Sequence, residues 1–150
     1  MPSKTVKQLE SVFQPESVAI VGASSSKGKV GHSVMKNVKE SEFEGEVYPI
    51  NLKADSIMGF TAYKSVTDVP GDIDLAVICV PAKFVVSVVK ECGEKGVKSI
   101  VIITAGFKEV GSEGAKLERE ITEIAQKHEM RVVGPNCLGV ITNANFSFAS

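Results

Sequence analysis

The sequence predicts an α/β fold in which a doubly wound, mostly parallel sheet of five strands carries helices on both faces. Short apolar runs alternate along the chain with longer segments whose apolar residues recur at helical spacing. This alternation is typical of right-handed βαβ units, which place their strands parallel in one sheet. The chain also shows no internal repeat, low-complexity tract or linker, so its 150 residues are expected to form one domain.

Five apolar runs are expected to be the strands of the sheet. The third run reads LAVICV, which is typical of a strand that is buried on both faces. The second contains Pro49, which lacks an amide hydrogen and therefore fits a strand end or an irregular position. In chain order the expected strands cover residues 18–21, 46–50, 75–80, 99–103 and 131–133.

Amphipathic segments between these runs are expected to be helices. Pro81 suits the first position of the helix after the third strand, and Gly93 and Gly96 close that helix. The polar, glycine-containing stretch 51–63 is expected to be a loop. The other expected helical segments, in chain order, are 5–13, 30–41, one turn at 65–68, and 112–128.

The composition excludes several classes of function. The formal net charge of −1 gives no general attraction to nucleic acid or to acidic membranes. No apolar run approaches the roughly 20 residues of a membrane span, and the N-terminus has no apolar signal core, so a cytoplasmic location is expected. The three cysteines form no CxxC pair, so neither a disulfide framework nor a zinc site is expected.

A turn rich in small residues follows the first expected strand and opens the next helix. The stretch from Ser17 to Gly31 reads SVAIVGASSSKGKVG. Gly22 allows a sharp turn, and the free amides and dipole of a helix start favour an anion, usually a phosphate. Lys27 and Lys29 add positive charge beside it. The sequence therefore predicts a phosphate-binding turn, with a plain strand-to-helix turn as the alternative.

The end of the second strand bears on which phosphate ligand is bound. An NAD-binding domain of this class carries an acidic residue there, which holds the ribose diol. This chain has Asn51 and then Lys53. A lysine suits an extra phosphate on the ribose, either the 2′-phosphate of NADP or the 3′-phosphate of coenzyme A. The residues alone leave these two ligands comparable, with NAD behind them.

Five motifs at the five expected strand ends resemble the CoA-binding domain of ADP-forming acyl-CoA synthetases, which is related to the alpha subunit of succinyl-CoA synthetase. They are FQPESVAIVGASSSKGKVG, VYPINLKADSIMG, DLAVICVPA, VIITAGF and GPNCLG, and the resemblance covers nearly the whole chain. In this family the N-terminal domain has a Rossmann-like fold that holds coenzyme A. The resemblance implies that the chain binds coenzyme A as one domain of a longer synthetase of the acetate type or a near relative.

The resemblance also implies a set of contacts to coenzyme A. The turn after the first strand would hold the diphosphate, and the end of the second strand would hold the ribose-phosphate. The third and fourth strand ends would line the adenine or pantetheine path, and the fifth would lie near the thiol. The implied residues are Gly22, Ala23, Ser24, Ser25, Ser26, Lys27, Gly28, Val30, Asn51, Lys53, Val80, Pro81, Ala82, Ile103, Thr104, Ala105, Asn136 and Cys137.

The family reaction interconverts acyl-CoA, ADP and phosphate with free acid, coenzyme A and ATP, through an acyl phosphate and a phosphorylated histidine. That histidine lies in a following domain, so the implied partners are the phosphohistidine and ATP-grasp domains. No paired carboxylates, metal-ligand cluster or Ser/His/Asp arrangement stands out, so no catalytic or metal-binding residue is expected in this chain. Two other functions stay open: a stand-alone coenzyme A-binding or regulatory protein, and an NADP-dependent oxidoreductase domain.

Overall fold

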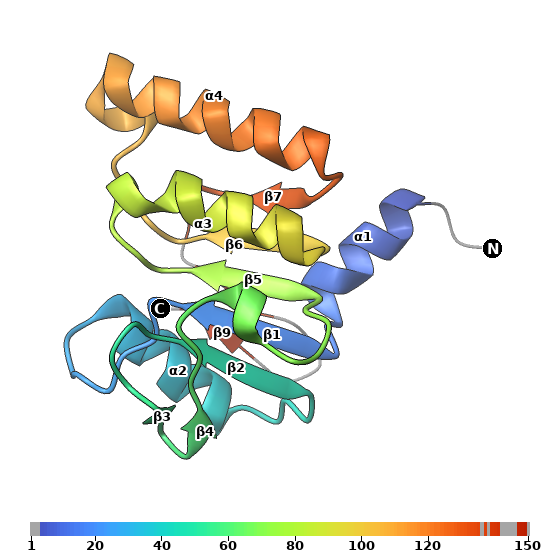
Figure 1. Cartoon of the computed structure of the whole chain (residues 1–150), viewed down its shortest axis with the longest axis vertical. Helices are drawn as coiled ribbons and strands as arrows, with labels where there is room; N and C mark the ends of the chain where they lie inside the picture. Colours follow the sequence, from blue (N-terminus) through green and yellow to red (C-terminus); the bar gives the residue numbers. More distant parts are fainter. Residues whose placement is uncertain (1–3, 136, 138, 142–146, 150) are drawn as a thin grey trace.

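A computed structural model of the chain describes residues 4–135, 137, 139–141 and 147–149. Five strands form one sheet in the order β2-β1-β5-β6-β7, and every pairing in it is parallel (Figure 1). The chain winds outward from β1 in both directions, which confirms the predicted doubly wound sheet. The strands are β1 (Ser17–Val21), β2 (Glu46–Ile50), β5 (Leu75–Ile78), β6 (Ser99–Ile102) and β7 (Arg131–Val133).

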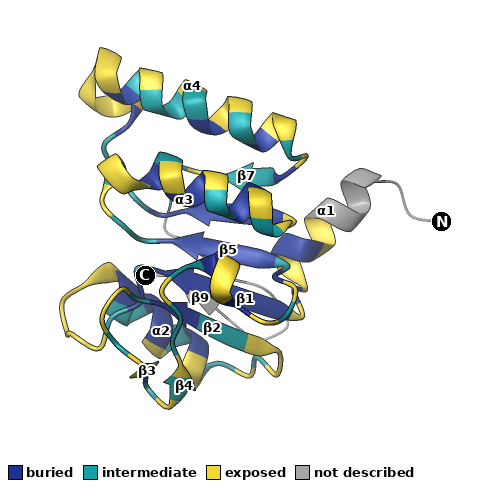
Figure 2. Cartoon of the chain, viewed as in Figure 1, coloured by how far each residue is buried: buried dark blue, intermediate teal, exposed yellow. Residues whose placement is uncertain are grey.

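Helices cover both faces of this sheet, as predicted. Alternate residues of β1 point to opposite faces: Ala19 and Val21 pack in one apolar cluster, and Val18 and Ile20 pack in another. All of β1 is buried because it lies inside the sheet and is covered on both sides (Figure 2). The first cluster includes α3 (Ala82–Lys95) and α4 (Ser112–Lys127), and the second includes α1 (Lys4–Phe13) and α2 (Val30–Glu40).

The stretch expected to be a loop after β2 contains a short hairpin. Its strands, β3 (Ser56–Ile57) and β4 (Phe60–Thr61), are joined by Met58 and Gly59, whose φ angles of 51° and 88° suit the tight two-residue turn of a hairpin. The hairpin is anchored by the buried side chain of Ile57 and by Lys39 of α2, whose Nζ donates to the Met58 carbonyl at 3.0 Å. Strands of two residues carry no readable period, so the sequence pattern did not reveal them.

Other differences concern the ends of elements. β5 and β6 end one or two residues earlier than expected, and Gly93 lies inside α3, which ends at Gly96 with a φ of 87°. Gly93 is small because the His128 ring packs on it: an added Cβ would lie 2.4 Å from the ring's Cδ2. No strand was expected after β7, yet β8 (Gly139–Ile141) and β9 (Ser147–Ala149) pair in the antiparallel sense. The expected turn at 65–68 is present as η1 (Val66–Asp68), and a second short turn is η2 (Lys108–Val110).

The start of α2 lies directly against the end of β1. A Cβ on Gly31, in the first turn of α2, would lie 1.9 Å from the Gly22 carbonyl oxygen. Gly22 has a φ of 88°, and its N–H donates to the Ile50 carbonyl of β2 at 3.1 Å. Only glycine at position 31 allows the two backbones to come this close. The contact therefore fixes where the helix begins relative to the sheet.

We expect Gly31→Ala to lower the free energy of unfolding by about 2–4 kcal/mol, because the added methyl group forces α2 away from β1. Denaturant unfolding at neutral pH measures the loss. Gly28→Ala is the matched control, since Gly28 has a φ of 86° but an added Cβ would meet no described atom within 4 Å. Its left-handed backbone alone should cost about 1 kcal/mol. Equal losses for the two variants would contradict the steric explanation.

Candidate functional site

The loops that follow the parallel strands gather at one edge of the sheet, because the carboxyl ends of parallel strands share an edge (Figure 1). The strand order reverses between β1 and β5, and in sheets of this kind ligands bind in the crevice outside that point. The loops from both sides meet there: a Cβ on Gly22 would lie 3.1 Å from the Val80 nitrogen. The structure thus brings the first and third predicted strand ends together.

The turn between β1 and α2 presents backbone amides and positive charge to solvent. Ser24 is half-buried and its Oγ accepts from the Ser26 N–H at 3.0 Å, whereas Ser25 to Val30 are exposed. Lys29 caps α2 without a side-chain hydrogen bond, and the first turn of α2 contains no acidic residue. The amides and dipole of the helix start are therefore not compensated by a carboxylate of their own helix. This arrangement suits an anionic ligand.

Asn51, at the end of β2, has both ends of its side chain bonded to the backbone. Its Nδ2 donates to the Ala23 carbonyl at 2.9 Å, and its Oδ1 accepts from the Lys53 and Ala54 N–H groups, each at 2.8 Å. The Asn51 side chain thus joins the turn after β1 to the loop after β2. The Lys53 side chain is exposed, and no hydrogen bond or ion pair of its ammonium is seen among the described residues.

The loops after β5 and β6 are joined in a similar way. Thr104 Oγ1 donates to the Val80 carbonyl at 2.6 Å, and the Ile103 N–H donates to the Ile78 carbonyl at 3.0 Å. Val80 and Ala82 are partly buried, while Pro81 and Ala105 are exposed. The two loops are therefore held side by side beyond β5 and β6, with the Thr104 hydroxyl hydrogen already donated within the chain.

Two of the three cysteines, Cys79 after β5 and Cys92 in α3, are packing residues. Burial raises the pKa of Cys79 to about 12, with the nearby charge of Cys137 adding to the rise, and burial raises that of Cys92 in α3 to about 12. Both are therefore protonated thiols at neutral pH. Cys137 donates from Sγ to the Ile102 carbonyl at 3.3 Å, which places it at the end of β6. Asn136, the other predicted residue of this strand end, lies outside the described residues.

Glu109 is a residue of this edge that the sequence analysis did not single out. Its Oε1 accepts from the Gly106 N–H at 2.6 Å and from the Phe107 N–H at 3.0 Å. These backbone hydrogen bonds hold the pKa of the Glu109 carboxyl below its usual value. The side chain therefore holds the loop after β6 in place. A side chain that folds back onto its own loop leaves no periodic signal, so spacing could not have found it.

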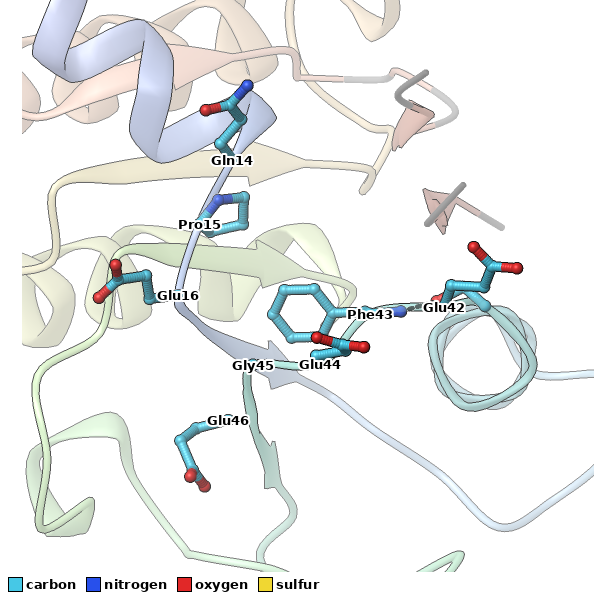
Figure 3. Close-up of a pocket in the computed structure, with 9 residues that line it drawn as sticks. Gln14, Pro15, Glu16, Glu42, Phe43, Glu44, Gly45 and Glu46 are labelled. Atoms are coloured by element: carbon cyan, nitrogen blue, oxygen red, sulfur yellow. Dashed lines mark hydrogen bonds between the residues drawn. The ribbon is translucent and has the colours of Figure 1, made fainter. Parts of the chain in front are cut away.

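A groove at the opposite edge of the sheet has the wrong charge for phosphates. Its volume is about 1040 Å³, and four exposed glutamates surround it (Figure 3). They are Glu16, Glu42, Glu44 and Glu46.

Within the described part of the chain, no three His, Cys, Asp or Glu residues are grouped to hold a metal ion. No described helix combines the length and apolarity needed to cross a membrane.

Sheet order and the glycine turn before α2 define a Rossmann-like α/β domain whose crevice lies between β1 and β5. The sequence profile described as "CoA binding domain" matches residues 16–143, and the chain belongs to that family. The family predicted from the five motifs is therefore confirmed.

Close relatives are known in archaea. The chain is 51% identical, over 93% of its length, to the alpha subunit of ADP-forming acetate–CoA ligase II from Pyrococcus furiosus. It is 54% identical, over 95% of its length, to the ADP-forming acetate–CoA ligase of Methanocaldococcus jannaschii. A solved structure of the dinucleotide forming acetyl-coenzyme A synthetase 1 of Ca. Korarchaeum cryptofilum, in complex with phosphate and ADP, matches 95% of the chain with 44% identity and a TM-score of 0.88. The chain spans 30%, 20% and 31% of these three proteins.

The stability that Glu109 provides should depend on pH. The folded chain holds the pKa of this carboxyl below 4.5, so its contribution is present above that value and is lost as pH falls through the lowered pKa. We expect Glu109→Ala to lower the melting temperature at neutral pH, and the difference from wild type to shrink below about pH 4. Glu123→Ala, which removes an exposed carboxylate of α4, is the control and should show neither effect. A difference that persists unchanged in acid would contradict the role of the carboxylate.

Proposed function

We propose that this chain binds coenzyme A at the carboxyl edge of its sheet, as the CoA-binding domain of an ADP-forming acyl-CoA synthetase that acts on acetate or a related acid. One observation carries the proposal: Asn51 joins the turn after β1, which leads into a helix start without a side-chain cap, to the loop that carries Lys53. Coenzyme A combines a diphosphate with a third phosphate on its ribose. The two neighbouring cationic features match that pair of groups.

The charges of the residues at this edge suit this ligand. Backbone amides and hydroxyls of Ser24 to Gly28 would hold the diphosphate, with Lys27 beside it, and Lys53 would hold the 3′-phosphate. The adenine or the pantetheine chain would run along Val80, Pro81, Ala82, Ile103, Thr104 and Ala105. The thiol end would then lie near Cys137 and Asn136.

Chemistry beyond binding is assigned to other domains. The chain spans less than a third of each of the relatives named above, so most of the synthetase lies in domains outside this chain. We infer that the phosphohistidine and ATP-grasp domains of the synthetase supply phosphoryl transfer. They would belong either to the same polypeptide or to a partner subunit, since the relatives include both a subunit and a longer ligase.

Calorimetric titration with coenzyme A, dephospho-CoA and NADPH at one salt concentration tests the proposal. We expect coenzyme A to bind, dephospho-CoA to bind more weakly, and NADPH not to bind. Lys53→Ala should weaken the binding of coenzyme A by about fivefold, which is the effect of losing roughly 1 kcal/mol from an exposed charge pair. The affinity for dephospho-CoA should stay unchanged.

Lys127→Ala is the matched control, because it removes an exposed lysine at the C-terminal end of α4. It should change none of these affinities. Binding of NADPH in place of coenzyme A would favour the oxidoreductase alternative. If Lys53→Ala lowered the affinities for coenzyme A and dephospho-CoA equally, Lys53 would not contact the 3′-phosphate.

A further inference from the structure

The loop that carries Lys53 packs against the domain through Ala54, but the two residues before it are exposed. Leu52 is 78% exposed and Lys53 is exposed, so neither side chain is buried against the body of the domain. What holds the backbone here is the Asn51 carbonyl oxygen Oδ1, which accepts from the N–H groups two and three residues further on. This is the turn that asparagine and aspartate side chains form with their own backbone.

The other end of the same side chain reaches a different strand end. Asn51 Nδ2 donates to the Ala23 carbonyl, 28 residues earlier in the chain, and the Asn51 backbone N–H donates to the Tyr63 carbonyl at 2.9 Å. Both backbone and side chain of Asn51 are therefore anchored. The loop of Lys53 cannot shift relative to the phosphate turn without breaking one of these bonds.

An asparagine is the residue that meets both demands at this position. It carries a donor and an acceptor on a short side chain. Aspartate would keep the acceptor but lose the donor, and would place a negative charge against the Ala23 carbonyl. Serine could still accept from the Lys53 N–H, since hydroxyls form the same turn more weakly. Its shorter side chain would not also bridge to Ala23.

We propose that Asn51 is a positioning residue that sets the preference of the site for a ligand with a phosphate on its ribose. Asn51 acts through Lys53, because it holds the Lys53 backbone at a fixed place relative to the turn that would bind the diphosphate. Its own amide contacts backbone rather than ligand. The inference rests on the proposed function. It predicts that loss of Asn51 changes the ratio of the affinities for coenzyme A and dephospho-CoA, and not only their common level.

The experiment measures this ratio calorimetrically for wild type, Asn51→Ala, Lys53→Ala and the double variant. Asn51→Ala should lower the ratio by about threefold to fivefold, within the range that an exposed charge pair provides. In the Lys53→Ala background, the same substitution should lower it no further, because the residue through which it acts is gone. Asn51→Ser should keep part of the preference, since it keeps the bond to the Lys53 N–H.

Hydrogen exchange of the ligand-free chain gives a readout that needs no coenzyme A. Asn51→Ala should accelerate exchange at the Lys53 and Ala54 amides, and Asn51→Ser should accelerate it less. Ser41→Ala is the matched control: it removes the hydroxyl that donates to the Val38 carbonyl and accepts from the Phe43 N–H, at the opposite end of α2. That variant should leave the affinity ratio and the two amides unchanged.

The outcomes separate the two proposals. If the wild-type chain shows no preference for coenzyme A over dephospho-CoA, the proposed ribose-phosphate site fails and the role of Asn51 falls with it. If wild type prefers coenzyme A but Asn51→Ala and Asn51→Ser keep the full preference, only the role of Asn51 is overturned. Equal weakening of both ligands also overturns it, because that result describes a residue that merely stabilises the fold.

Discussion

The approach of α2 to the end of β1 is the contact on which the carboxyl edge of the sheet depends. With no side chain on Gly31, the first turn of the helix lies against the Gly22 carbonyl, where any Cβ would overlap. The helix start, and with it the positive end of the helix dipole, is thereby brought to the point where the strand order reverses. Ser25 to Val30 then turn outward, with Lys27 and Lys29 exposed to solvent.

Three polar side chains hold the other loops of this edge around that point. Asn51 holds the loop after β2, Thr104 ties the loop after β6 to that after β5, and Glu109 folds the loop after β6 onto itself. Each bond joins a side chain to the backbone. Such bonds can order a loop that has few buried apolar side chains of its own. Loops that are ordered before a ligand arrives do not have to lose that freedom on binding, so a ligand at this edge would bind with a smaller loss of conformational entropy.

Sequence reasoning found the features that depend on a period or on a motif. The buried run LAVICV, the helix ending near Gly96 and the glycine turn all follow from patterns that act over a few neighbouring residues. The hairpin at Ile57 and Phe60 was missed because its strands are too short for alternation to show. The bonds of Asn51 to Ala23 and of Cys137 to Ile102 join residues far apart in sequence, so only the fold reveals them. The motif placed Asn51 at the right edge, but a motif alone does not distinguish a ligand contact from a support.

The identity of residue 51 also bears on which nucleotide the domain suits. A carboxylate at the end of the second strand accepts hydrogen bonds from a free ribose diol, which is the arrangement typical of NAD-binding domains. Here a neutral amide stands in that place, its carbonyl is used by two loop amides, and the charge that reaches solvent nearby is that of Lys53. An aspartate at position 51 would place a negative charge beside that lysine and would repel a ribose phosphate. Asparagine at position 51 therefore supports the loop through its acceptor, joins it to Ala23 through its donor, and adds no charge that would repel a phosphate on the ribose.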